Sequence, residues 1–230
     1  MSELNRKIDE VDELLDRAVR DFSPVVFANS LGAEDMVLTD LIAKHHREIC
    51  MFSLDTGRLP QETYDLMQAV RARYDAPLAI YFPNSDLVEE YVAKNGVNGF
   101  YDSVEKRKAC CHIRKVEPLK RALKDKGAWI TGMRRDQAVT RAALEVSAFD
   151  AEQGLQKYNP LLDWSNADVW EYIRRFDVPY NKLHDRFYPS IGCAPCTRQV
   201  TPGEDIRSGR WWWESAEGKE CGLHISHKRT

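Results

Sequence analysis

The sequence lacks an apolar run long enough to cross a bilayer, and its first residues, MSELNRKIDEVDELL, lack the apolar core of a secretory signal. It also lacks internal repeats, low-complexity segments and a linker that would divide it into two domains. These absences predict a cytoplasmic protein with reduced thiols and no membrane association. We expect one domain over residues 1–230, a length that can bury a proper core.

A basic excess is missing too. The chain has 33 Lys and Arg residues against 36 Asp and Glu residues, a net charge of −3. That balance argues against a dedicated nucleic-acid binder. Bases nevertheless cluster around residues 106–121, 134–141 and 207–210, which suits a small anionic ligand. No nucleoside-triphosphate loop ending in Gly-Lys-Ser/Thr is present, so ATP hydrolysis of that type is not expected.

Apolar periodicity predicts an α/β fold. Apolar residues from Ile8 to Val19 follow helical spacing, so the chain opens with an amphipathic helix. Strands are predicted at 24–29, 49–54, 78–82 and 128–132, with helices between them, and further strands at 144–149 and 155–161. This alternation is typical of a doubly wound, mostly parallel sheet. A helix capped by Ser165 follows, and from Pro179 to the end we expect a loop-rich flap.

Three turns follow predicted strands, at SLGAEDM (30–36), LDTGRLP (54–60) and residues 132–137. In such sheets ligands bind beyond the carboxyl ends of the strands. Gly32 permits close approach of the backbone, and the free amides of a helix start favour an anion. An ordinary turn capped by Ser30, and a simple helix cap at Asp55, are the alternatives. Taken together the turns outline a nucleotide pocket.

The six cysteines include an adjacent pair, Cys110 and Cys111, and a C-x-x-C pair, Cys193 and Cys196. Four thiolates suit zinc or an iron–sulfur cluster. A zinc tetrahedron usually takes two C-x₂₋₄-C knuckles, whereas two divergent neighbouring thiolates can each bind one iron corner of a [4Fe–4S] cube. The spacing favours the cluster, with zinc and an incidental arrangement as alternatives.

The other two cysteines have different settings. Cys50 lies inside an apolar run and is expected to be inert core. Cys221 lies in the polar stretch GKECGLHISHK near the end of the chain. An accessible thiolate near cationic groups is a nucleophile. The alternative is an exposed tail cysteine without a role.

Several basic residues follow predicted strands or cysteines. Lys115 comes one helical turn after Cys111, so it is expected on the same face. Arg134, Arg135 and Arg141 follow the fourth strand, and Arg207 and Arg210 precede three tryptophans. Each alone is more often a surface charge, but together they predict an anion site. Trp211, Trp212 and Trp213 are expected to pack the flap onto the core.

The motifs SLGAED, LDTGRLP, CCHIRKVEPL, TGMRRDQ, YNPLLDWS, GCAPCTR, GRWWWE and ECGLH occur together over almost the whole chain. In this combination the sequence resembles the sulfonucleotide reductases, in particular the iron–sulfur-containing adenylyl-sulfate (APS) reductases of assimilatory sulfate reduction. The resemblance implies a fold like that of the adenine-nucleotide alpha hydrolases. Their S-G-G-x-D-S loop is matched here without the second Gly and the final Ser.

The resemblance also implies a chemistry. Cys221 would attack the sulfur of APS and displace AMP, and thioredoxin or glutaredoxin would release sulfite from the resulting S-sulfocysteine. Cys110, Cys111, Cys193 and Cys196 would hold one [4Fe–4S] cluster per subunit of a homo-oligomer. The positions implied for substrate binding are Ser30, Gly32, Ala33, Glu34, Asp35, Leu54, Asp55, Thr56, Gly57, Lys115, Gly132, Arg134, Arg135, Arg141, Arg207, Arg210 and His224.

Other functions stay open at this point. A reductase of the 3′-phosphorylated substrate (PAPS), or of both substrates, is the nearest. An iron–sulfur tRNA-thiolating ATP pyrophosphatase would need an intact S-G-G-x-D-S loop and a more basic chain, and both are missing. A zinc-binding module without enzymatic activity is the third.

Overall fold

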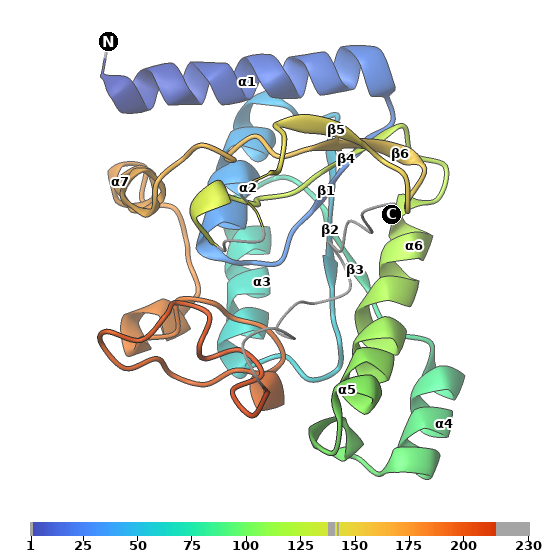
Figure 1. Cartoon of the computed structure of the whole chain (residues 1–230). Coiled ribbons are helices and arrows are strands. Elements are labelled where there is room, and N and C mark those ends of the chain that lie inside the picture. Colours follow the sequence, from blue (N-terminus) through green and yellow to red (C-terminus); the bar gives the residue numbers. More distant parts are fainter. Residues whose placement is uncertain (1, 138–140, 142, 215–230) are drawn as a thin grey trace. The chain divides into compact units, whose positions relative to one another are not determined.

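The structure is a computed structural model that describes residues 2–137, 141 and 143–214. Its described residues form a sheet with the strand order β3-β2-β1-β4-β6-β5 (Figure 1). The strands are β1 (Val25–Ala28), β2 (Cys50–Leu54), β3 (Leu78–Tyr81), β4 (Ala128–Ile130), β5 (Ser147–Asp150) and β6 (Leu155–Tyr158). β1 pairs in parallel with β2 and β4, β4 pairs in parallel with β6, and β5 is antiparallel to β6. The predicted α/β fold with a mostly parallel sheet is confirmed.

The chain separates into two compact units. The first, here called the sheet unit, comprises residues 1–53, 61–79 and 125–186. The second, here called the cysteine unit, comprises residues 54–60, 80–124 and 187–230. In the part of the chain that the structure describes, no helix combines the length and the apolar character needed to span a membrane.

In its described residues the sheet unit has four α-helices, two of which begin at serine side-chain caps, Ser2 and Ser165. The helices are α1 (Glu3–Phe22), α2 (Ala33–His45), α3 (Gln61–Arg73) and α7 (Asn166–Arg175), with short 3₁₀ turns η3 (Arg135–Gln137) and η5 (Lys182–Arg186). The predicted cap Ser165 is confirmed, and it forms a reciprocal capping box with Asp168 at the start of α7. Asp168 also accepts a hydrogen bond from Lys7 Nζ at 2.5 Å, which ties α7 to α1.

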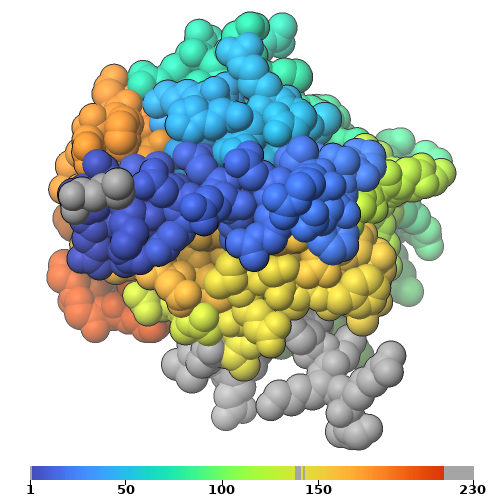
Figure 2. Space-filling view, turned by 90° about the horizontal axis from the view of Figure 1, so that it is seen from above, coloured from blue at the N-terminus to red at the C-terminus, as the bar shows by residue number. Residues whose placement is uncertain are grey.

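The core of the sheet unit lies between the sheet and its helices. β1 and β4 are apolar and buried, as expected of central parallel strands. α1 buries Val11, Leu14, Leu15 and Ala18, so the predicted amphipathic helix is confirmed. Each fully buried Leu or Val stabilises the fold by about 1.5–3 kcal/mol. Figure 2 shows α1 in dark blue across one face, between lighter blue and yellow segments.

The cysteine unit contains α4 (Ser85–Asn95), η1 (Gly99–Tyr101), α5 (Val104–Cys111), η2 (His112–Val116), α6 (Glu117–Leu123) and η6 (Ala194–Cys196). Its small core packs Phe100, Cys193, Cys196 and Trp211 together. Trp211 is 1% exposed, whereas Trp212 stays 39% exposed. From Phe187 to Glu214 the described chain consists of turns and loops apart from η6, as predicted for the loop-rich flap.

Candidate functional site

In the sheet unit, the turn after β1 is held by its own side chains. Asn29 Oδ1 accepts a hydrogen bond from the Leu31 amide at 2.7 Å. Asp35 Oδ2 accepts from the Ser30 amide at 2.6 Å and from the Ser30 hydroxyl at 2.5 Å. α2 starts at Ala33, with Gly32 in the cap position and no side-chain cap. Exposed Ser30 therefore stands beside a helix start, where backbone amides favour anions.

Asp35 also fixes the turn after β4. A Cβ on Gly132 would lie 2.0 Å from Asp35 Oδ1, so only glycine allows this approach. Burial raises the pKa of Asp35 to about 6, although hydrogen bonds from Ser30 and the Gly132 backbone favour the ionised form. The carboxyl joins two of the three predicted ligand turns in one buried contact.

The arginines after β4 are engaged with the protein itself. Arg134 is 3% exposed and donates from Nε to Glu34 Oε1 at 2.9 Å and from Nη1 to the Trp164 carbonyl at 3.3 Å. Arg135 donates to Asp163 at 3.0 Å and to the Leu144 carbonyl at 2.7 Å. Arg141 donates to Gln137. The structure thus brings Arg134 to the first turn through Glu34.

In the cysteine unit, the LDTG turn has the geometry of an aspartate-stabilised turn. Asp55 Oδ1 accepts from the Gly57 amide at 2.7 Å. Gly57 has a φ of +69°, a conformation that glycine adopts readily. Half-buried Leu54 precedes them at the end of β2. Thr56 Oγ1 lies 3.2 Å from Cys193 Sγ, so this turn reaches the cysteines directly.

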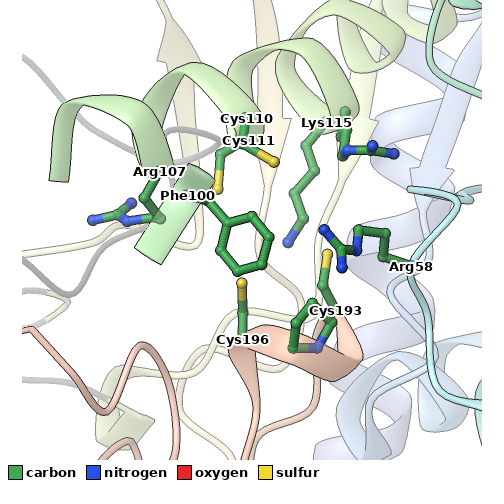
Figure 3. Close-up of a pocket in the computed structure, with 10 residues that line it drawn as sticks. Arg58, Phe100, Arg107, Cys110, Cys111, Lys115, Cys193 and Cys196 are labelled. Atoms are coloured by element: carbon green, nitrogen blue, oxygen red, sulfur yellow. The ribbon is translucent and has the colours of Figure 1, made fainter. Parts of the chain in front are cut away.

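The predicted cysteine quartet is brought together. Cys110 and Cys111 end α5, and Cys193 and Cys196 flank η6. Figure 3 shows the sulfur atoms of Cys193 and Cys196 pointing toward the helix that carries Cys110 and Cys111. The four line one pocket together with Arg58, Phe100, Arg107, Arg114, Lys115 and Pro195. All four are free thiols, half-buried at Cys110 and buried at the other three.

The segment after the adjacent cysteines is a π-helix. η2 spans His112–Val116, directly between α5 and α6. Such single π turns inside helices are frequent at functional sites. Lys115 lines the pocket with Cys111, as its sequence spacing predicted, but through a π turn rather than an α turn. The same turn brings Arg114 Nη1 to the Thr56 carbonyl at 2.6 Å.

The four thiols line the same pocket and are largely shielded from water. Burial raises the pKa of Cys196 to about 12, and neighbouring Cys193 acts in the same direction. Burial likewise raises the pKa of Cys110, while Arg114 and Arg58 lower it. Cys110 and Cys196 therefore need positive charge beside them to become thiolates. The four thiols together have the donor set of a soft-metal centre.

Arg210 is built into the same unit. Its guanidinium lies over the Trp211 ring at 4.7 Å, and a Cβ on Gly192 would fall 2.2 Å from Nη2. Arg210 favours the thiolate of Cys196, as does Lys115. Among the described residues, Arg210 Nε is buried without a hydrogen-bond acceptor. Half-buried Arg207 precedes it, and the Arg207 carbonyl accepts from the Arg210 amide at 2.9 Å.

One sequence expectation about a cysteine is wrong. Cys50 is the first residue of β2 and is exposed, not inert core. Its neighbours Ile49 and Met51 are both buried, so Cys50 is a single exposed position within the apolar run, because successive residues of an extended chain point to opposite faces. Cys221 and His224 lie outside the described residues, so the predicted nucleophile stays a prediction.

Besides Phe100 and Pro195, three basic residues of the pocket were not predicted as site residues. Arg58 lies over the Phe100 ring at 4.8 Å and donates to the Val97 carbonyl at 2.7 Å. Arg107 is fully buried and lines the pocket. Arg114 also lines the pocket and donates a hydrogen bond to the Thr56 carbonyl. Arg107 and Arg114 flank the adjacent cysteines in RKACCHIRK, which could have indicated their place in the pocket. A basic residue in such a stretch fits the surface of a helix equally well, however.

Known proteins share this arrangement of sequence and fold. The chain is 56% identical over 92% of its length to the adenosine 5′-phosphosulfate reductase of Allochromatium vinosum, of which the match covers 83%. A crystal structure of the phosphoadenylyl-sulfate (PAPS) reductase from Candida auris has a TM-score of 0.70 and 31% identity, covering 87% of this chain and 98% of that one. A crystal structure of the FMN adenylyltransferase of Candida glabrata has a TM-score of 0.60, and the match covers 95% of this chain and 77% of that one. Its sequence is 14% identical, so this likeness shows the fold alone.

The family model described as the phosphoadenosine phosphosulfate reductase domain matches residues 24–199. That span contains all three predicted ligand turns and all four pocket cysteines. The chain belongs to the phosphoadenosine phosphosulfate reductase domain family.

Proposed function

We propose that this chain reduces adenosine 5′-phosphosulfate to sulfite and AMP in assimilatory sulfate reduction. The observation that carries the proposal is the pocket in which four free cysteines meet Lys115, Arg114 and Arg58. A relative with 56% identity is named adenosine 5′-phosphosulfate reductase, which favours the nucleotide without a 3′-phosphate as the substrate.

The quartet fits a [4Fe–4S] cluster, one per subunit. Cys110 and Cys111 are neighbours whose side chains diverge on α5, and a cube offers each a separate iron corner. Thr56 Oγ1, at 3.2 Å from Cys193 Sγ, can donate a hydrogen bond to that thiolate. When bound, the cluster would supply iron charge that keeps the four sulfurs ionised.

Cations around the pocket suit an anionic substrate. Lys115 and Arg114 lie on the π turn and Arg58 on the LDTG turn. Buried Arg210 Nε has no acceptor among the described residues, and leaving a buried donor unpaired costs about 1–3 kcal/mol. An oxygen of the phosphosulfate would accept the hydrogen bond that Arg210 Nε can donate. Like charges approach when a thiolate attacks an anion, so such cations stabilise the transition state.

The reaction balances with thiols as the only reductant. The Cys221 thiolate attacks the sulfate sulfur, an S–S bond forms, the bond from sulfur to the phosphate oxygen breaks, and AMP leaves with the electron pair. A thiol of thioredoxin or glutaredoxin then attacks Cys221 Sγ, and sulfite leaves. A second thiol of the same donor resolves the mixed disulfide, so two thiols become one disulfide. The proposed location is the cytoplasm, which keeps these thiols reduced, and the proposed assembly is a homo-oligomer.

The substrate is tested by steady-state kinetics with APS and PAPS under anaerobic conditions. We expect kcat/KM for APS to exceed that for PAPS by about tenfold or more, which corresponds to about 1.4 kcal/mol. Equal constants would replace the proposal by a dual-substrate reductase. A preference for PAPS would overturn the proposed substrate, and the chain would then act on the substrate named for the Candida auris enzyme.

The cluster is tested by iron analysis and visible absorption. Cys111→Ser should lose iron, colour and activity. Cys50→Ser is the matched control, because Cys50 is exposed and lies outside the quartet, and it should keep all three. Full iron and turnover in Cys111→Ser would exclude the cluster, and one colourless zinc per chain would replace it.

The nucleophile is tested by mass spectrometry after incubation with APS in the absence of a thiol donor. A sulfonate-sized mass increment should appear on the peptide that contains Cys221. Cys221→Ser should keep its iron and bind APS but release no sulfite. An adduct on exposed Cys50, or turnover by the serine variant, would overturn this assignment.

A further inference from the structure

The sheet unit carries a second group of metal-ligating side chains, formed by Asp12, His45 and His46. One donor atom from each lies within 4.8 Å of the others. Asp12 Oδ2 is 3.2 Å from His45 Nδ1, and Asp12 Oδ1 is 2.8 Å from His46 Nε2. Asp12 lies on α1, whereas His45 ends α2 and His46 caps it.

The surroundings of His46 match those of a metal-binding histidine. Its side chain is 3% exposed, and its other ring nitrogen, Nδ1, lies 3.3 Å from Asp16 Oδ1 but has no hydrogen-bond partner among the described residues. Ligating histidines almost always present that second nitrogen to a carboxylate, which fixes the ring and the tautomer. Asp16 stands one turn after Asp12 on α1, so one helix face supplies both carboxylates.

The electrostatics of the place favour a cation. His45 and His46 lie at the carboxyl end of α2, a helix of 13 residues whose dipole carries partial negative charge there. Asp12, Asp16 and Glu48 all act on His46 as negative charges. Two imidazoles with a carboxylate suit zinc and its transition-metal neighbours, whereas Mg²⁺ and Ca²⁺ prefer oxygen ligands throughout.

We infer that Asp12, His45 and His46 form a binding site for Zn²⁺ that joins α1 to the end of α2. Donors about 2.0–2.2 Å from a tetrahedral zinc ion lie roughly 3.3–3.6 Å apart, near the 3.2 Å contact of Asp12 with His45 and wider than its 2.8 Å contact with His46, which would have to open slightly. His45, 51% exposed, can turn to close the remaining gap, and water would take the fourth position. This site is independent of the proposed reductase function.

The test is equilibrium dialysis against buffered Zn²⁺ with the full chain, loaded with its cluster. The Cys221→Ser background is used because the tail sequence CGLHISH offers rival zinc donors. We expect one zinc per chain with micromolar affinity, and no competition from Mg²⁺ at about a thousandfold excess. Hydrogen exchange with and without Zn²⁺ should show added protection in α1 and the last turn of α2.

Variants make the assignment specific. Asp12→Asn and His45→Gln should each weaken zinc binding by about tenfold or more, as should the outer-sphere change Asp16→Asn. Asp9→Asn, an exposed carboxylate on the same helix, is the matched control and should bind normally. His45 is exposed, so its variant should fold even if changes at buried His46 do not. Unchanged zinc affinity in Asp12→Asn and His45→Gln, or equal binding of Mg²⁺, would overturn the inference.

Discussion

Arg107 and Glu214 form a buried two-point ion pair in the cysteine unit. Arg107 donates from Nε to Glu214 Oε1 at 2.9 Å and from Nη2 to Oε2 at 2.8 Å. Their side chains are 0% and 3% exposed, and the guanidinium also lies over the Trp211 ring at 4.7 Å. Arg107 lines the cysteine pocket, so the pair fixes the chain after the tryptophans beside the quartet.

Glu214→Gln should therefore destabilise the protein strongly. The change leaves a buried guanidinium without its counter-charge, which costs about 3–5 kcal/mol in comparable pairs. Urea unfolding followed by tryptophan fluorescence measures the loss. Glu204→Gln breaks the Arg198–Glu204 pair at the surface of the same unit and serves as control. Equal shifts in the two variants would show that burial of the first pair adds nothing.

Lys115→Gln should separate catalysis from cluster binding. The lysine lines the pocket without being a sulfur ligand, so iron content should stay normal. Removing one preorganised cation should lower kcat/KM for APS by about 10²–10³-fold. Lys120→Gln, an exposed lysine on the following helix, should leave the rate unchanged. Loss of iron in Lys115→Gln would instead assign the lysine to cluster retention.

Asp35 should make the stability of the sheet unit depend on pH. Its pKa in the folded chain is raised to about 6 from 3.8. The folded chain then holds this proton more tightly than the unfolded chain. The carboxyl therefore lowers the free energy of unfolding as pH rises from about 4 to 6, by about 3 kcal/mol in total.

The comparison of wild type with Asp35→Asn isolates this carboxyl from the others. The unfolding free energy of wild type minus that of the variant should fall between pH 4 and pH 6 and be level above about pH 7. Urea unfolding at each pH provides the values. A difference that rises with pH over the same range would mean that the pKa of Asp35 is lowered.

Gly132 and Gly32 should tolerate alanine very differently. A Cβ at Gly132 would lie 2.0 Å from Asp35 Oδ1, whereas at Gly32 the nearest atom, Ser30 Oγ, is 3.4 Å away. Overpacking costs about 1–3 kcal/mol, so Gly132→Ala should lower the melting temperature by several degrees. Gly32→Ala should leave it nearly unchanged. Comparable losses in both would show that the first turn is packed as tightly as the second.

The elements that the sequence predicted correctly are those with a strong local pattern. β1 and β4 are uninterrupted apolar runs, and α7 has both partners of a capping box within four residues. The quartet was predictable because four cysteines with two kinds of spacing have few other uses. The prediction for Cys50 was wrong because an apolar run does not reveal which of its residues faces solvent.

Long-range partners were beyond the sequence. Arg107 pairs with a carboxylate 107 residues away, and Arg58 binds the Val97 carbonyl 39 residues away. Neither basic residue differs locally from a surface charge. Arg134 was predicted to hold substrate, and its close partner proved to be Glu34 in the same turn region. Such pairings depend on the topology, which brings separate segments together only after folding.

The π turn at His112–Val116 has a consequence for comparing chain lengths. A turn closed by i→i+5 hydrogen bonds holds one residue more than an α turn. Removing that residue would let the segment close as an ordinary α turn, and the bulge that carries Arg114 and Lys115 at the pocket would be lost. Relatives that keep the adjacent cysteines should therefore keep the number of residues between Cys111 and Pro118, whereas relatives without the quartet are free to lose one. A single-residue gap in this stretch would mark, in any related sequence, whether the pocket has been abandoned.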